Sequence, residues 1–227
     1  MSSSLAGATL AFDLDGTLVD TAPDLVGTLN VLLKEEGLQP LPLEEARPYI
    51  GRGARWLIER GFTASGWDLP ASKIGGLFDR FIDHYLAHIA DESRPFPGVR
   101  EALEAVRGAG ARTVVCTNKR TDLSRVLLDA LSMSQLFDAI VGADVVPAIK
   151  PDPRHLIAAV DEAGGNVARA LMVGDAATDA GAARAAGAPL VLVSFGYTEI
   201  PPAELAPDAL IDHFDELPEV AERLLGA

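Results

Sequence analysis

Cysteine is almost absent from this sequence of 227 residues, in which Cys116 is the only one. A single cysteine excludes an intramolecular disulfide framework and leaves no set of thiolates for a structural zinc site. Basic residues are scarce too, since 19 lysines and arginines stand against 33 acidic residues and the formal net charge is −14. A field of that sign repels phosphate backbones, so we expect no nucleic-acid partner.

Long apolar runs are missing as well. No window approaches the roughly 18 uninterrupted apolar residues of a membrane-spanning helix, so we expect no membrane insertion. The N-terminal stretch has no basic residue before Lys34, and its apolar run stops at Asp13, unlike a secretory signal. Together with the low cysteine content, these features favour a cytoplasmic location.

Short apolar runs that end at polar or glycine-containing turns recur along the chain, as buried parallel strands do. Segments of helical length lie between them. This alternation predicts an α/β fold with a doubly wound parallel sheet, a Rossmann-like core. The expected strands are 10–13, 113–116, 139–141, 170–173, 190–193 and 209–211, and the expected helices between them are 99–109, 121–131, 154–163 and 178–186.

Residues 21–93 break this alternation. Leucines recur at helical spacing over 25–32, and apolar residues over 74–89 follow the i, i+3, i+4, i+7 pattern of an amphipathic helix. No strand-like run lies in this interval. We therefore expect an inserted α-helical cap of residues 21–93 on an α/β core formed by residues 1–20 and 94–227.

Aspartates follow two of the expected strands, at the edge where open α/β sheets bind ligands. Asp13 and Asp15 follow the first strand, and Asp175 and Asp179 follow the strand of 170–173. Two carboxylates about 4 Å apart repel by roughly 4 kcal/mol at an effective dielectric of 20, so a cation must lie among them. Oxygen ligands without histidine or cysteine select Mg²⁺. The sequence therefore predicts a magnesium site.

Phosphate chemistry fits the residues that face these aspartates. Thr117 and Asn118 follow another strand, and Lys150 precedes a proline. An aspartate beside Mg²⁺ can act as a nucleophile, while a lysine, a hydroxyl and backbone N–H groups neutralise and hold phosphoryl oxygens. Each aspartate alone is also typical of a turn or a helix cap, so the prediction depends on the whole set.

Taken in order, these elements resemble the four motifs of the haloacid dehalogenase-like phosphatases, over nearly the whole chain including the helical cap. The matching segments are 13–19 (DLDGTLV), Thr117-Asn118, Lys150-Pro151 and 174–179 (GDAATD). The dehalogenase branch lacks an aspartate at the position of Asp15, so the resemblance is to the phosphotransfer branches. It implies a magnesium-dependent phosphatase that hydrolyses a small phosphoester substrate through an aspartyl-phosphate.

The resemblance also implies a role for each residue. Asp13 would be the nucleophile, and Asp15 would protonate the leaving alcohol and then activate the attacking water. The implied ligands of Mg²⁺ are Asp13, the backbone carbonyl of Asp15, and Asp175, with Asp179 supporting them. The implied phosphoryl-binding residues are Thr117, Asn118 and Lys150, of which Lys150 also counts as catalytic. Many members have serine where this chain has Ala176, which removes one hydroxyl near the metal.

Shorter patterns are similar to the phosphoglycolate phosphatase subgroup of that family. They lie at 51–54 (GRGA), 96–99 (FPGV) and 195–198 (FGYT). The similarity implies hydrolysis of 2-phosphoglycolate to glycolate and phosphate. Arg52, on a glycine-flanked cap loop, could fork onto the carboxylate of that substrate, although a solvated charge on a turn explains it equally well.

Three alternatives stay open. The substrate could be another small ester or pyrophosphate, or the protein could be a phosphosugar mutase that returns the phosphoryl group to a sugar. A receiver-like phosphate-sensing or interaction protein would also place aspartates, a threonine and a lysine at strand ends. The receiver-like hypothesis does not explain the helical insertion of residues 21–93, which is much longer than an ordinary loop. Both a monomer and a homodimer are compatible with the sequence.

Overall fold

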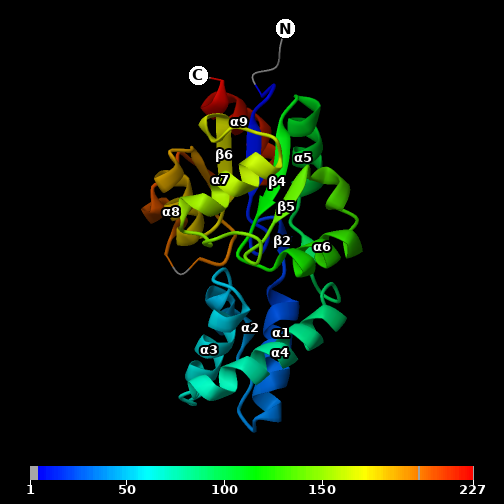
Figure 1. The fold of residues 1–227 in the computed structure, drawn as a ribbon, viewed down its shortest axis with the longest axis vertical. Coiled ribbons are helices and arrows are strands. Elements are labelled where there is room, and N and C mark those ends of the chain that lie inside the picture. Colours follow the sequence, from blue (N-terminus) through cyan, green and yellow to red (C-terminus); the bar gives the residue numbers. More distant parts are fainter. Residues whose placement is uncertain (1–4, 199, 227) are drawn as a thin grey trace.

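The computed structural model describes residues 5–198 and 200–226, so residues 1–4, 199 and 227 of the expected core lie outside it. Within the described residues, six parallel strands form one sheet in the order β5-β4-β1-β6-β7-β8 (Figure 1). They are β1 (Thr9–Phe12), β4 (Arg112–Cys116), β5 (Ala139–Val141), β6 (Ala170–Gly174), β7 (Leu190–Val193) and β8 (Ala209–Ile211). The predicted α/β fold with a parallel sheet is confirmed.

The central strands are continuously apolar because helices cover both faces of the sheet. β1, β6 and β7 are buried along their whole length. Successive side chains of β1 point to opposite faces, so that Leu10 and Phe12 belong to one core and Ala11 to the other.

Helices lie on both faces of the sheet. One face packs against α5 (Val99–Gly108), α6 (Thr121–Ala130) and α9 (Leu217–Leu225), and the other packs against α7 (Pro153–Glu162) and α8 (Ala177–Ala186). Helix α9 buries Leu217, Ala221 and Leu225. In the part of the chain that the structure describes, short 3₁₀ helices occupy Arg47–Tyr49, Ser134–Leu136, Val167–Arg169, Pro202–Leu205 and Phe214–Glu216.

The remaining helices form a second group beyond one edge of the sheet (Figure 1). They are α1 (Ala22–Glu35), α2 (Leu43–Ala46), α3 (Ala54–Ala64) and α4 (Ala71–Ala87). The strands β2 (Val19–Asp20) and β3 (Arg94–Pro95) pair antiparallel and bring the two ends of this helical group together. The sequence predicted helices near α1 and α4 but neither α3 nor this strand pair. Among the described residues, none of the helices combines the length and apolar composition that crossing a bilayer requires.

Candidate active site

Three strand ends meet at the sheet edge that faces the helical group. β4 and β6 flank β1 on either side, in parallel register. Asp13, Thr117 and Asp175 come directly after β1, β4 and β6. The strand order therefore brings together residues that are far apart in the sequence, as predicted.

Asp13, Asp175 and Asp179 form a buried carboxylate cluster. One oxygen from each side chain lies within 4.8 Å of the other two. The ammonium of Lys150, also buried, lies 2.9 Å from Oδ1 of Asp13 and 2.7 Å from Oδ1 of Asp179. Lys150 therefore pairs with two of the three acidic side chains of the cluster.

Burial and the neighbouring charges shift the pKa values of the residues in this cluster. Burial raises the pKa of Asp13 to about 6; Lys150 lowers it, while the charges of Asp179 and Asp15 raise it further. Burial and the charges of Asp179 and Asp13 raise the pKa of Asp175 well above its ordinary range. Burial alone would lower the pKa of Lys150, but Asp13 and Asp179 raise it above its ordinary value. The cluster therefore carries more negative charge than its lysine balances, which favours a divalent cation.

Asp179 holds the loop after β6 in place. Its Oδ2 accepts hydrogen bonds from the backbone N–H of Asp175 at 3.1 Å and of Ala176 at 3.0 Å. Its Oδ1 accepts from Lys150 at 2.7 Å. Both carboxylate oxygens of Asp179 are therefore engaged by protein donors, which suits the supporting role predicted for it.

Asp175 is oriented by close backbone approach. Its Oδ1 accepts a hydrogen bond from the Thr17 hydroxyl at 3.0 Å, and its Oδ2 accepts from the N–H of Tyr197 at 2.7 Å. Gly16 has φ +83°, and a Cβ there would lie 2.7 Å from Oδ2 of Asp175. A Cβ on Gly196 would come within 2.1 Å of the Asp175 Cβ. The site therefore requires glycine at both positions.

Lys150 is positioned through its own backbone. The peptide bond between Lys150 and Pro151 is cis. The N–H of Lys150 donates to Nδ1 of the buried His155 at 3.3 Å, and Nε2 of that ring lies 3.2 Å from the carbonyl oxygen of Val141. Burial lowers the pKa of His155 to about 4, with a further decrease from Lys150, so the ring is neutral at pH 7. His155 belongs to none of the sequence motifs identified above.

Asp15 lies apart from the carboxylate cluster and pairs with a second buried lysine. Nζ of Lys119 is 3.0 Å from Oδ1 and 3.2 Å from Oδ2 of Asp15. The Thr21 hydroxyl also donates to Oδ1, at 2.8 Å. Burial alone would lower the pKa of Lys119, but the charge of Asp15 and, after it, the interaction with Tyr85 raise it above its ordinary value. The sequence motifs place Asp15 and Lys119 after neighbouring strands but do not indicate that the two side chains form an ion pair.

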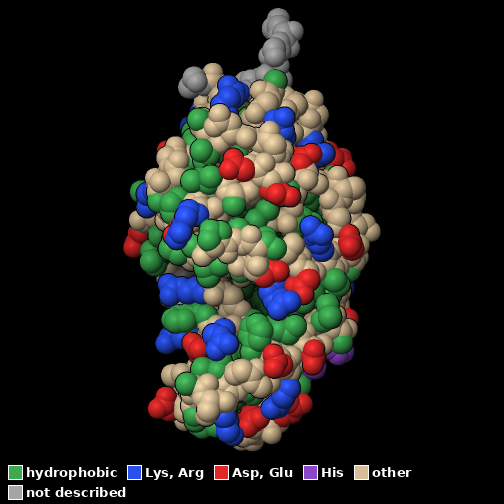
Figure 2. Space-filling view, in the orientation of Figure 1, with side chains coloured by type: hydrophobic (Ala, Val, Ile, Leu, Met, Phe, Trp, Pro, Cys, Tyr) green, Lys and Arg blue, Asp and Glu red, His purple; other side chains and the backbone are tan. Residues whose placement is uncertain are grey.

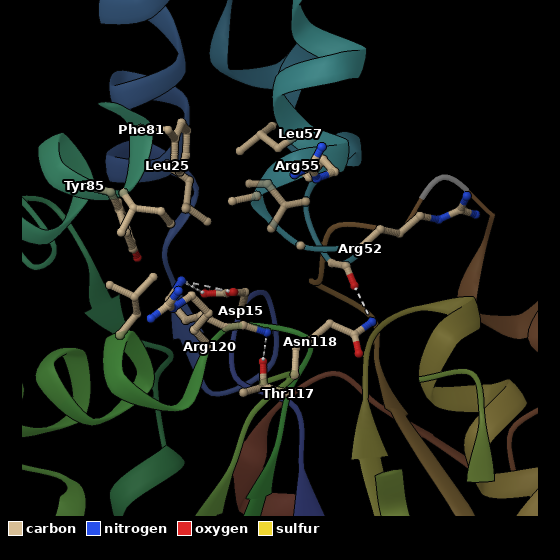
Figure 3. Close-up of a pocket in the computed structure, with 18 of the residues that line it drawn as sticks. Asp15, Leu25, Arg52, Arg55, Leu57, Phe81, Tyr85, Thr117, Asn118 and Arg120 are labelled. Carbon is tan, nitrogen blue, oxygen red and sulfur yellow. Dashed lines mark hydrogen bonds and ion pairs between the residues drawn. The ribbon is translucent and has the colours of Figure 1, made fainter. Parts of the chain in front are cut away.

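The side chain of Asn118 connects the helical group with the core. Its Nδ2 donates to the carbonyl oxygen of Gly51 at 3.1 Å (Figure 3). It also donates to the carbonyl oxygen of Lys150, at 3.1 Å. Its Oδ1 is buried without a hydrogen-bond partner among the described residues. Thr117 Oγ1 accepts from the N–H of Lys119 at 3.2 Å. The amide N–H groups of Asn118 are thus committed to backbone, which leaves main-chain groups and the Thr117 hydroxyl to bind a phosphoryl oxygen.

A cavity of about 220 Å³ separates these strand ends from α1, α3 and α4 (Figure 3). Figure 2 shows lysine and arginine side chains gathered at the level where the helical group meets the sheet. The polar lining of the cavity near the strand ends consists of Asp13, Asp15, Thr117, Asn118 and Lys119. The apolar lining includes Leu25, Ile50, Leu57, Phe81, Tyr85 and Leu123. The space is suited to a small polar molecule that enters between charged and apolar walls.

Arg52 lines this cavity but does not reach the acidic residues. Its side chain points away from Asp15 (Figure 3). Its guanidinium lies over the ring of Trp56, 4.9 Å from the centroid. The structure therefore brings together all the predicted site residues except the guanidinium of Arg52.

Known proteins are similar to this chain in both sequence and fold. The sequence profile of the haloacid dehalogenase-like hydrolases matches residues 10–193. A phosphoglycolate phosphatase of Caulobacter vibrioides is 58% identical over 221 residues, which cover 97% of this chain and 93% of that protein. A second phosphoglycolate phosphatase, from Agrobacterium fabrum, is 45% identical over 216 residues, covering 95% and 93%. The crystal structure of a predicted phosphoglycolate phosphatase from Haemophilus somnus 129PT has a TM-score of 0.87 at 31% identity, covering 94% of this chain and 97% of that one.

These similarities extend over the helical group as well as the sheet. The profile match begins in β1 and ends in β7, so it spans the strand ends that carry Asp13, Thr117 and Asp175. The relatives cover nearly the whole chain at identities that show common descent. The chain therefore belongs to the haloacid dehalogenase-like hydrolases, and it is a phosphoric monoester hydrolase similar to phosphoglycolate phosphatases.

Proposed function

We propose that this enzyme hydrolyses 2-phosphoglycolate to glycolate and phosphate through an aspartyl-phosphate on Asp13, in a magnesium-dependent reaction. The observation that carries the proposal is a small cavity bordered by both Asp13 and Asp15, with Lys150 paired to Asp13. A cavity of about 220 Å³ suits a metabolite of a few heavy atoms. The relatives named phosphoglycolate phosphatase support the choice of substrate.

The buried carboxylates fit a magnesium ion. The donor set of Asp13, Asp175 and Asp179 consists only of oxygens, as Mg²⁺ prefers. Burial and, after it, the charges of neighbouring aspartates raise the pKa values of Asp13 and Asp175, and a bound cation would offset both effects. Asp13, Asp175 and the backbone carbonyl of Asp15 would hold the ion, with Asp179 supporting them. When bound, Mg²⁺ neutralises charge on the phosphoryl oxygens and on the carboxylates.

In the first step, an oxygen of Asp13 attacks phosphorus and the bond to the ester oxygen breaks. Asp15 gives a proton to the departing glycolate oxygen. In the second step, Asp15 takes a proton from water, which attacks the phosphorus of the aspartyl-phosphate and returns Asp13 as a carboxylate. Lys150 and Thr117 hold the phosphoryl group through both steps by charge and by hydrogen bonding.

The helical group would act as the lid of this site. We assign residues 21–93 to the cap and residues 1–20 and 94–227 to the catalytic core. The pairing of β2 with β3 supports this division, because both crossings between the two parts lie there. Closure of the cap would exclude bulk water while the covalent intermediate exists.

Phosphate release from a panel of small substrates tests the proposal. The panel holds 2-phosphoglycolate, ethyl phosphate, a hexose phosphate and pyrophosphate, each assayed with Mg²⁺ and with EDTA. We expect the highest kcat/KM for 2-phosphoglycolate and no turnover in EDTA. A flat profile that still needs Mg²⁺ would refute the substrate alone. A stable phosphoprotein without phosphate release would favour a signalling role instead.

A further inference from the structure

The hydroxyl of Tyr85 is buried without a hydrogen-bond partner among the described residues. The residue is only 1% exposed, although it lines the cavity. Its side chain extends from α4 toward Asp15 (Figure 3). Buried tyrosine hydroxyls normally find a partner, so an unpaired one at a cavity wall marks a place for a ligand atom.

A cation lies next to this hydroxyl. Nζ of Lys119 is 4.5 Å from the ring centroid of Tyr85. Its two ion-pair hydrogen bonds both go to the carboxylate of Asp15, whereas an ammonium has three donors. Tyr85 as well as Asp15 raises the pKa of Lys119, so the ammonium and the phenol lie close enough for one bound oxygen to accept from both.

The arginines that also line the cavity have other partners. Arg120 is hydrogen-bonded to Asp122, and the guanidinium groups of Arg52 and Arg55 lie over the rings of Trp56 and Phe78. Leu25 and Phe81 line the same part of the cavity, and both are buried apolar side chains. An anionic group placed here loses water, so it needs direct donors from the protein. Burial raises the pKa of Tyr85 to about 12, against a smaller lowering effect of Lys119, so the phenol keeps its proton and can donate it.

We propose that the Tyr85 hydroxyl and the Lys119 ammonium together bind the carboxylate of the substrate. This inference rests on the proposed hydrolysis of 2-phosphoglycolate. In that molecule one methylene separates the ester oxygen from the carboxylate. When the ester oxygen lies at Asp15 to receive a proton, the carboxylate must therefore lie beside Asp15, where Lys119 is hydrogen-bonded.

The same arrangement would couple closure of the cap to binding of the correct substrate. Tyr85 belongs to α4 of the helical group, and Lys119 follows β4 of the sheet. A carboxylate held by both would link the two parts. Arg52 has no share in this recognition, since its guanidinium lies over Trp56.

The Tyr85→Phe variant tests the proposal, because it removes only the hydroxyl. The measured quantity is the ratio of kcat/KM for 2-phosphoglycolate to that for ethyl phosphate, in which a methyl group replaces the carboxylate. We expect this ratio to fall on the order of tenfold or more, as for a lost hydrogen bond to a charged group. The melting temperature should change little, because the hydroxyl accepts and donates no hydrogen bond of normal geometry within the described residues.

Tyr49→Phe is the matched control, since Tyr49 is a partly exposed tyrosine of the helical group that does not line the cavity. It should leave the ratio unchanged. An unchanged ratio in Tyr85→Phe, with a wild-type enzyme that prefers 2-phosphoglycolate, would overturn this inference and leave the proposed function standing. A wild-type enzyme without that preference would overturn both.

Discussion

Replacing Asp13 by asparagine removes one negative charge from the buried cluster with almost no change in side-chain volume. Lys150 loses one of its two carboxylate partners but keeps Asp179 at 2.7 Å. The variant should have no phosphatase activity, because an amide is no nucleophile here. Its stability is the more informative property, since the electrostatics of the cluster predict a gain.

The magnitude follows from the pKa of Asp13. Its rise from 3.8 to about 6 means that the folded, metal-free protein binds the proton more tightly than the unfolded chain. At about 1.4 kcal/mol per pKa unit, ionisation of Asp13 costs roughly 3 kcal/mol of folding free energy at pH 7. This cost is absent below about pH 4, grows as the pH rises toward 6, and is complete above it. Asparagine avoids it.

Urea unfolding in EDTA measures this effect directly. We expect Asp13→Asn to be more stable than the wild type by about 2–3 kcal/mol near pH 7 and by much less near pH 4.5. Asp79→Asn, at an exposed position of α4, serves as the control and should change stability little at either pH. If Asp13→Asn were equal to or less stable than the wild type near pH 7, the cluster would not be under the electrostatic strain described here.

Two further predictions concern the loop geometry and the metal. Gly16→Ala should lower the melting temperature by several degrees, because the added Cβ would meet Asp175 and the φ of this residue is +83°. Gly7→Ala is the control in the same thermal unfolding experiment, and it should lower the melting temperature less, because Gly7 has a similar φ of +75° but no atom within 4 Å of the added Cβ. Mg²⁺ should raise the wild-type melting temperature more near pH 7 than near pH 5, because protons compete for Asp13; no shift at either pH would refute the proposed metal site.

The strands and the acidic cluster were predictable because their causes are local in the sequence. Strands buried on both faces read as continuous apolar runs, and parallel strands bring their carboxyl ends to one edge. Asp13 and Asp175 follow β1 and β6, which are neighbours in the sheet. The sequence did not predict helix α3, because glycines precede it and its apolar stripe is short. Its buried residues are Leu57, Ile58, Gly61 and Phe62.

The features that required the structure depend on how distant elements pack. Tyr85 belongs to the apolar stripe of α4, and from the sequence it is a core residue like Phe81. Only the packing of α4 over the strand ends shows that Tyr85 lines the cavity. The direction of the Arg52 side chain depends in the same way on the position of Trp56.

Trapping the covalent intermediate tests the central claim most directly. Acetyl phosphate has a leaving group that needs little protonation, so Asp15→Asn should still form the aspartyl-phosphate but hydrolyse it roughly 10²–10⁴-fold more slowly. Acid quenching and peptide mass spectrometry then locate the phosphoryl group. The account predicts it on the peptide that carries Asp13, in Asp15→Asn but not in the double variant with Asp13→Asn. A phosphoryl group on another residue, or none while acetyl phosphate is still consumed, would contradict it.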